Sequence, residues 1–301
     1  MPSLRSVETT GRLGQSFSEK LLDLLGPIIL RSKTGVIAWV TAKEAIRQPF
    51  FVVLIGVGCL LMLVYPFIPY FTFGEDIKMV KDTGLATILL LGLILALLTS
   101  SNSIAEDIEH RTAITLLSKP INRRQFIIGK FLGILVAVAL IFVVLGLVFG
   151  AVLYYKVAYD ARESAKQVPT FADQWAEVQQ VLPGLVLTYF QVVVLSALSV
   201  AISTRLPLVV NIVVCFAIYF LGHLAPVLER ASQGSFVLVH FTAQMIGVVF
   251  PALGFFDVAP AVATGSPIPL SYVLLNLVYC ILYSAVGILL AFILFEDRDL
   301  A

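Results

Sequence analysis

The sequence predicts an all-α protein that crosses a membrane several times. Hydrophobic residues make up 59% of the 301-residue chain and charged residues only 13%, whereas a soluble domain is about 45–50% apolar and about 25% charged. The apolar residues gather in long uncharged intervals, and lysine and arginine are unevenly divided between the segments that join them. A soluble fold of this length could not cover its surface with so few charges, so these three observations predict a polytopic membrane protein.

Seven uncharged intervals are long enough to hold a membrane-spanning helix. A helix needs about 20 residues to cross the hydrocarbon core, and a charge placed there costs about 2.5–3.5 kcal/mol. The last interval opens with a stretch rich in proline and glycine, which favours turns, so we expect the span itself to run over Ser271–Phe295. The seven intervals are 48–74, 83–105, 131–155, 178–204, 206–228, 231–256 and 258–295.

The interval 231–256 differs from the others because polar residues and a proline divide it into short apolar pieces. Each piece is about half a membrane long, which suits a hairpin that enters the membrane and turns back against protein. We therefore expect six transmembrane helices, with an outer re-entrant hairpin at about 231–257 before the last span. A seventh span through this interval is the alternative.

Both termini are predicted to be cytoplasmic. Lysine and arginine concentrate in the cytoplasmic segments of membrane proteins. With six spans, fourteen of the 20 lysine and arginine residues fall in the segments on the side of the N-terminus, and six fall on the other side. The six are Lys78, Lys81, Lys156, Arg162, Lys166 and Arg230.

The residues before the first span are expected to form a cytoplasmic segment, 1–47, with interfacial helices. Apolar residues recur at helical spacing around Ser16–Leu25, so this stretch is predicted to lie on the inner leaflet, with a soluble helix packed on a partner protein as the alternative. A second interfacial segment, 36–47, is predicted to lead into the membrane domain, 48–301.

The loop between the second and third spans, about 103–126, carries the most specific pattern in the chain. Ser103 and Glu106 have the spacing of a capping box, which predicts that a short helix begins at Ser103. Acidic residues in its first turns and Lys119 at its end match the helix dipole. Pro120 then ends the helix.

A second capping-box spacing, Asn122 with Gln125, predicts the start of the third span. The expected result is a rigid helix–turn–helix that is fixed to two spans and presented to the cytoplasm. Such an element can pass a displacement from a soluble partner into the membrane helices. The alternative is a solvated loop whose charges only set the topology.

This loop resembles the coupling-helix region of the permease subunits of ABC-2 type transporters. In that family an acidic stretch leads into a Gly-Thr or Arg-Thr pair, a Leu-Leu pair, a Ser-Lys-Pro or Ser-x-Pro turn, an arginine and then a Gly-Lys pair at the next span. The segment Lys43-Glu44-x-x-Arg47 likewise resembles the family's connecting helix before the first span. The matching loop residues are Glu106, Asp107, Glu109, Arg111, Thr112, Leu116, Leu117, Ser118, Pro120, Arg123, Gly129 and Lys130.

The resemblance implies the permease half of an ATP-driven exporter in a prokaryotic plasma (inner) membrane. Two such chains, identical or paralogous, would face each other among the membrane lipids. Each would dock its cytoplasmic coupling helix on a separate ABC ATPase subunit. The surface that meets the ATPase would comprise Glu106, Asp107, Glu109, Arg111, Leu116, Leu117, Pro120 and Arg123.

The resemblance also implies that this chain is not itself an enzyme. The sequence contains no Walker-type Gly-x-x-x-x-Gly-Lys-Ser/Thr motif, so ATP and Mg²⁺ are expected on the partner ATPase, and this chain is expected to bind no cofactor or metal. Nucleic acid is not an expected partner either, because a net charge of +1 leaves no basic surplus to neutralise phosphates.

Two other classes of function fit parts of the sequence. Glu106-Asp107-x-x-x-Arg111 is similar to the Glu-Glu-x-x-x-Arg signature of an intramembrane metalloprotease family, which would need His223 and His240 as partners. By the predicted orientation both histidines lie near the outer side while Glu106 faces the cytoplasm, and residues on opposite faces cannot share one metal. A membrane anchor or scaffold without transport would share the topology but would need no coupling helix.

The fourth predicted span carries serines at three- and four-residue steps, Ser196, Ser199 and Ser203, so one of its faces is small and polar. Such faces let helices approach closely and form hydrogen bonds across the contact. We expect this face to be either a close helix contact or a dimer seam.

Overall fold

The computed structural model describes residues 32–68, 76–109, 122–163, 169–232 and 237–296. Over these ranges the chain is helical and contains no strand, which confirms the all-α class. Six helices are long and apolar enough to cross a membrane, in agreement with the predicted number of spans. They are α3 (Pro49–Val64), α4 (Asp76–Glu109), α6 (Arg123–Glu163), α7 (Phe171–Ser203), α8 (Leu208–Ala231) and α11 (Leu270–Glu296).

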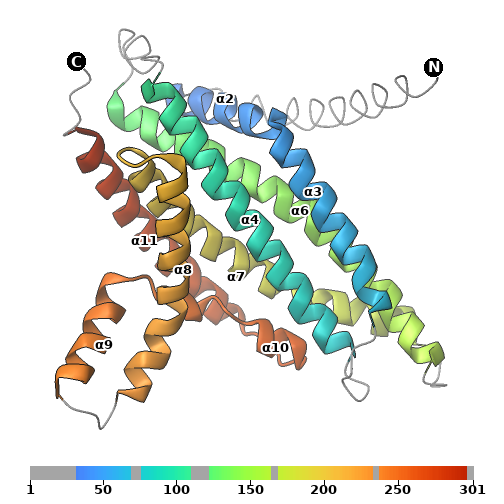
Figure 1. The fold of residues 1–301 in the computed structure, drawn as a ribbon. Coiled ribbons are helices and arrows are strands. Elements are labelled where there is room, and N and C mark those ends of the chain that lie inside the picture. Colours follow the sequence, from blue (N-terminus) through green and yellow to red (C-terminus); the bar gives the residue numbers. More distant parts are fainter. Residues whose placement is uncertain (1–31, 69–75, 110–121, 164–168, 233–236, 297–301) are drawn as a thin grey trace, which may run out of the picture.

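The six helices form one slanted bundle with two distinct ends (Figure 1). A further helix, α2 (Lys33–Arg47), lies across the end at which α4 stops and α6 starts, and the short α10 (Ala259–Ala263) lies at the opposite end. We call these the α2 end and the α10 end. Each span runs from one end to the other, so the direction of the chain alternates from span to span.

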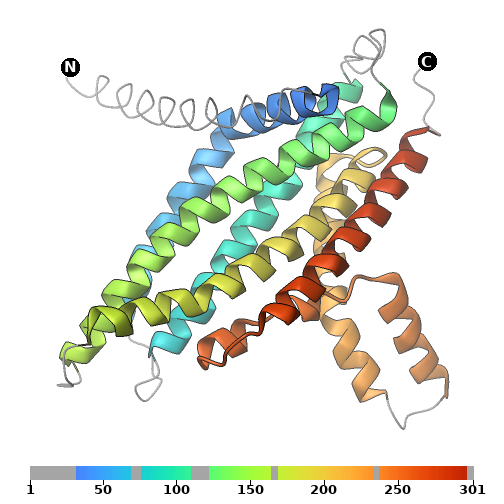
Figure 2. The ribbon, with the colours of Figure 1, turned by 180° about the vertical axis from the view of Figure 1, so that it is seen from behind.

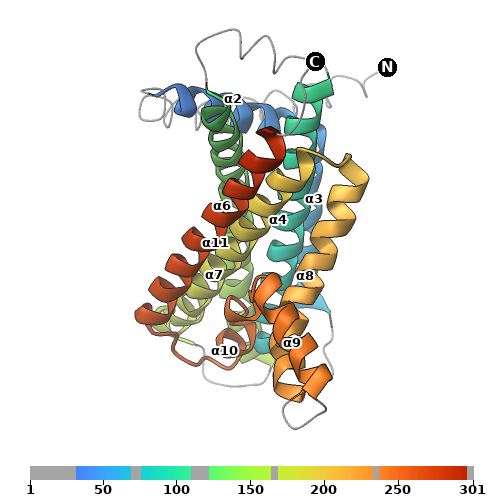
Figure 3. The same cartoon turned by 90° about the vertical axis from the view of Figure 1, so that its left-hand side faces the viewer.

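The bundle has two layers, with the most buried helices at its centre. Figure 2 shows α6, α7 and α11 side by side, and Figure 3 shows that α3 and α8 lie on the other side of the bundle, with α4 between them and that layer. The apolar windows of α4 and α7 are mostly buried within the chain, whereas only about a quarter of the residues in those of α3, α8 and α11 are buried. The exposed apolar faces are those that a bilayer would cover.

Three of the helices, α4, α6 and α7, extend well past their uncharged intervals at the α10 end, and α4 starts at Asp76 rather than near residue 83. The third span was expected to end near residue 155, but α6 continues to Glu163, and α7 starts at Phe171 rather than near residue 178. Thr170 caps α7: its backbone N–H donates to the Asp173 carboxylate at 2.9 Å, and its side chain accepts in return from the backbone of Asp173. Charged residues therefore continue these helices instead of forming a separate loop.

The described part of the interval around 231–257 holds no seventh span, and its helix forms a hairpin with the end of α8 rather than within the interval. The helix α9 (Val237–Val249) has 13 residues and runs back antiparallel along the end of α8 (Figure 1). At about 1.5 Å per residue it covers about 20 Å, less than the hydrocarbon core. The chain then crosses α8 at Gly222, where an added Cβ would lie 2.6 Å from the Pro251 carbonyl oxygen, before it reaches α10.

The segment before the first span is helical where the structure describes it. The predicted segment 36–47 is the greater part of α2, whose N-terminus is capped by the Ser32 hydroxyl accepting from the Gly35 N–H at 3.1 Å. The predicted amphipathic helix Ser16–Leu25 lies outside the described residues.

Candidate coupling site at the α2 end

The residues predicted to meet an ATPase divide into a described and an undescribed set. Glu106, Asp107 and Glu109 occupy the last turns of α4, and Arg123 is the exposed first residue of α6. These two helix ends share the α2 end of the bundle (Figure 1). The residues that lie outside the described part of the chain are Arg111, Leu116, Leu117 and Pro120.

One predicted helix start is wrong and the other is confirmed. No new helix begins at Ser103, because α4 continues without a break to Glu109. The Ser103 side chain is instead buried and accepts a hydrogen bond from Lys130 at 2.8 Å. At the other side of the loop, α6 begins after Asn122, whose backbone N–H donates to the Gln125 side chain at 3.3 Å, as the capping-box spacing predicted.

Lys130 ties α4 to α6 just inside the loop. Only 6% of this lysine is exposed, and its ammonium lies 5.7 Å from the centre of the Phe126 ring as well as on the Ser103 hydroxyl. Removing an ammonium from water is costly unless other groups stabilise it, and cations are attracted to aromatic faces. The burial therefore fixes the spacing between the two helices that carry the loop.

Two glycines place α2 directly on α6. A Cβ added at Gly129 would lie 2.7 Å from the Cβ of Ile37, and one added at Gly133 would lie 2.5 Å from the Ala38 carbonyl oxygen. Glycines four residues apart on one helix face let a second helix approach to backbone contact. The Gly129-Lys130 pair thus has two structural roles: the glycine receives α2, and the lysine holds α4.

Two further contacts, a hydrogen bond and a pair of stacked rings, join the remaining helix ends at the α2 end. The Arg205 side chain, in the turn between α7 and α8, donates through Nε to the Leu294 carbonyl oxygen of α11 at 2.7 Å. The rings of Phe126 and Phe295 stack with centroids 6.1 Å apart and connect α6 to α11. With α2 on α6 and α6 on α4, the helix ends around the loop form one contiguous packed unit.

A buried polar cluster continues these contacts toward the bundle interior. The Asn211 amide of α8 donates to Ser101 of α4 at 2.6 Å and to Ser199 of α7 at 2.8 Å. Ser199 is also hydrogen-bonded to Ser100, and Cys215 donates to the Asn211 oxygen at 3.3 Å. Every member is buried. This cluster joins α4 to two further spans, α7 and α8.

The serine face of the fourth span is therefore a close contact within one chain and not a dimer seam. Ser196, Ser199 and Ser203 are all buried in the single chain. Ser199 makes contacts to α4 and α8, while Ser196 and Ser203 donate to carbonyl oxygens of their own helix.

Sequence reasoning treated two lysines near the α10 end only as topology signals, but they are buried partners of carboxylates. Lys81 of α4 is 2% exposed and contacts Glu177 and, at 3.0 Å, Gln180, both on α7. Lys156 of α6 is equally buried, and it pairs with Asp160 of the same helix at 2.8 Å and with Asp76 of α4 at 3.8 Å. No spacing in the sequence shows which helices these long side chains bridge.

The geometry does not bring together the residues that a metalloprotease would need. His223 bonds to Gln191 at 3.2 Å and to the Tyr219 carbonyl oxygen at 3.0 Å, so both ring nitrogens have partners. It lies about 20 Å along α8 from the α2 end, at about 1.5 Å per residue, whereas Glu106 lies in the last turns of α4, at the α2 end itself.

Comparison with protein families identifies the chain. Residues 35–300 match the family described as ABC-2 family transporter protein, which is nearly the whole length. The chain belongs to this family. No curated protein matches it. Members of the ABC-2 family are membrane components of transporters and are typically non-catalytic, and membership implies association with an ABC ATPase.

Proposed function

We propose that this ABC-2 family chain is the permease subunit of an exporter and that its α2 end is the surface on which a cytoplasmic ATPase docks. The docking surface is the segment that joins α4 to α6, with Glu106, Asp107 and Glu109 in the last turns of α4 and Arg123 at the start of α6. ATP and Mg²⁺ bind to the ATPase. The observation that carries the proposal is the packed junction of α2, α4 and α6 beneath this loop.

The orientation of the proposal rests on charge. The α2 end includes the segments that carry fourteen of the 20 lysine and arginine residues, and such segments stay in the cytoplasm. Both termini are then cytoplasmic, in a prokaryotic plasma membrane. In this orientation α2 lies along the inner face of the membrane as an interfacial helix, and the segment that holds α9 is re-entrant from the outer side.

The mechanism follows from how the junction is built. A displacement of the loop reaches α4 and α6 together, because Lys130 joins them, and reaches α2 because glycines seat it against α6. The Asn211 cluster then passes the displacement to α7 and α8. ATP-driven closure of two ATPases would thus move two facing permease chains, identical or paralogous, between inward- and outward-facing states.

A double charge reversal tests the docking surface. Asp107→Arg combined with Glu109→Arg replaces two anions of the docking surface with two cations. These cations would face the groups of the ATPase that pair with the anions, and like charges across an interface cost several kcal/mol. We expect the co-purified ATPase and ATP-driven transport both to fall at least tenfold. The measurements are ATPase recovered per permease after mild detergent extraction and transport in reconstituted vesicles.

The matched control reverses a charge at the other end of the bundle. Asp82→Arg changes an exposed residue of the same helix α4, at its α10 end. It should leave ATPase recovery unchanged. Normal recovery of the ATPase with Asp107→Arg/Glu109→Arg would overturn the docking surface. If Asp82→Arg also lost the ATPase, the loss would show only that α4 tolerates no charge reversal.

A further inference from the structure

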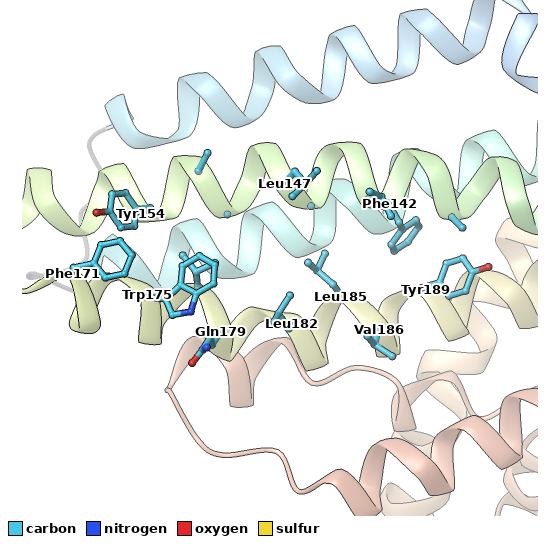
Figure 4. A pocket seen from close by; sticks show the side chains of 16 residues that line it. Phe142, Leu147, Tyr154, Phe171, Trp175, Gln179, Leu182, Leu185, Val186 and Tyr189 are labelled. Atoms are coloured by element: carbon cyan, nitrogen blue, oxygen red, sulfur yellow. The ribbon is translucent and has the colours of Figure 1, made fainter. Parts of the chain in front are cut away.

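A long apolar groove runs between α6 and α7 on the outside of the bundle (Figure 4). Its volume is about 740 Å³. Its walls include Leu147 of α6, which is 72% exposed, and Leu182 of α7, which is 54% exposed, so the groove opens sideways from the bundle. Uncharged side chains alone line it. In a membrane-spanning helix pair this opening faces the bilayer.

Two glycines of α6 leave the space. Gly146 and Gly150 lie one turn apart in the groove. A Cβ added to them would lie 3.3 Å from the Leu185 side chain and 3.4 Å from the Val178 side chain, both on α7. Larger residues at these two positions would project into the groove and fill it.

The aromatic end of the groove is lined by Tyr154, Phe171 and Trp175 and lies at the α10 end (Figure 4). The rings of Tyr154 and Phe171 pack edge to face, with centroids 6.1 Å apart. Tyr and Trp are enriched where a membrane meets water. At the other end, the rings of Phe142 and Tyr189 pack edge to face, with centroids 5.5 Å apart.

The length of the groove fits one acyl chain. Phe142 and Tyr154 are about 18 Å apart along α6 at about 1.5 Å per residue, close to the depth of one leaflet, about 15 Å. An acyl chain of one leaflet therefore matches the groove from end to end.

A cation lies where the head group of such a lipid would be. The lining residues of α6 recur at three- and four-residue steps toward Tyr154, and eight residues further along the same helix is Arg162, which is exposed. Eight residues are about 12 Å along the helix axis. Arg162 therefore stands beyond the aromatic end, outside the hydrocarbon, and arginine favours phosphate oxygens.

We propose that this groove binds one acyl chain of an anionic phospholipid from the leaflet at the α10 end, with Arg162 at the phosphate. The chain lies along the two glycines, its terminal methyl group reaches the Phe142–Tyr189 pair, and the aromatic end contacts the glycerol region. This lipid is held at a site of its own between two helices, in contrast to the lipids that surround the exposed faces of α3 and α11.

Photo-crosslinking tests the site on the full chain in lipid nanodiscs. The probe is phosphatidylglycerol with a diazirine at the middle of one acyl chain, and labelled peptides are mapped by mass spectrometry. We expect labelling concentrated on the groove residues of α6 and α7. Gly146→Leu with Gly150→Leu should reduce it at least fivefold. The matched control is Gly56→Leu on α3, an exposed glycine where an added Cβ meets nothing within 4 Å.

Two further variants keep the test decisive. Leu147→Trp fills the groove from its exposed rim without entering the contact between the helices, so it should also reduce labelling of the groove. It keeps the test valid if the glycine variant fails to fold. Arg162→Gln should lower the ratio of labelling by phosphatidylglycerol to labelling by phosphatidylcholine at least threefold. Equal labelling of α3, α11 and the groove, or labelling unchanged by either filling variant, would overturn the proposal. Neither readout needs the ATPase, so the outcome is independent of the proposed docking surface.

Discussion

The two ends of the bundle are held together by different kinds of interaction. At the α2 end the helices meet backbone to backbone, where Gly129 and Gly133 receive α2. At the α10 end they are linked by long charged side chains, such as the buried Lys81, which pairs with Glu177. Packed backbones keep one separation, because any added atom overlaps, whereas ion pairs can adjust or part. The α2 end is thus suited to transmit a displacement and the α10 end to open.

The largest effect is expected from a change that separates α2 from α6. In Gly133→Leu the new side chain would overlap the Ala38 carbonyl and Thr41, and overpacking costs about 1–3 kcal/mol or more. We expect the thermal midpoint of the detergent-solubilised protein to fall by several degrees and ATP-driven transport to be lost. Gly56→Leu, which adds the same side chain in open space on α3, should change neither. An unchanged midpoint in Gly133→Leu would show that the α2 end is not rigidly packed.

An intermediate effect is expected at the α10 end. Lys81→Met removes the hydrogen bonds of an ammonium to Glu177 and Gln180, and hydrogen bonds to charged groups contribute about 1.5–3 kcal/mol. We expect a smaller fall of the thermal midpoint than in Gly133→Leu. Adding Glu177→Gln should restore part of it, because no unpaired charge then remains.

The ion pair has its own control. Asp82→Asn removes a charge from the next residue of α4, which is exposed, and should have little effect on the midpoint. If Lys81→Met were as mild as Asp82→Asn, the Lys81–Glu177 contact would not hold the α10 end together, and the contrast between the two ends would fail.

The smallest effect is expected from the polar cluster between the ends. Asn211→Ala removes the amide that bridges Ser101 and Ser199, and hydrogen bonds between membrane helices contribute about 0.6–1.7 kcal/mol. We expect a fall of a few degrees at most in the midpoint, but a clear loss of transport per ATP hydrolysed. Asn276→Ala is the matched control, since Asn276 donates within its own helix to Tyr272. Equal coupling losses in both variants would remove the role of the cluster in transmission.

Much of the fold was predictable because the membrane imposes a simple rule on composition. Uncharged intervals of sufficient length gave the six spans, and the interrupted interval near 231–257 was correctly separated from them. The helix ends were harder to predict. The sequence placed a helix start at Ser103 from a capping pattern, but in the bundle this serine is buried against Lys130, so α4 continues through it.

The candidate site was predictable only as a segment. The acidic and Leu-Leu pattern located the loop between the second and third spans, and the family match over residues 35–300 supports the resemblance on which its assignment rested. The residues that fix the geometry around it were not apparent. Gly133 belongs to no motif. Asn211 is one of several polar residues in the spans, and only its contacts with α4 and α7 distinguish it.

The sequence by itself determined the class of the protein, the number of its spans and the side on which its basic segments gather, because each depends on the local cost of placing charge in hydrocarbon. The tertiary structure decided which side chains meet. The seat of α2 on α6, the Lys130–Ser103 link, the pairing of Lys81 with Glu177 and the groove between α6 and α7 each join residues from different helices. Those contacts follow from how the helices pack against one another, and no pattern along a single helix specifies its neighbour.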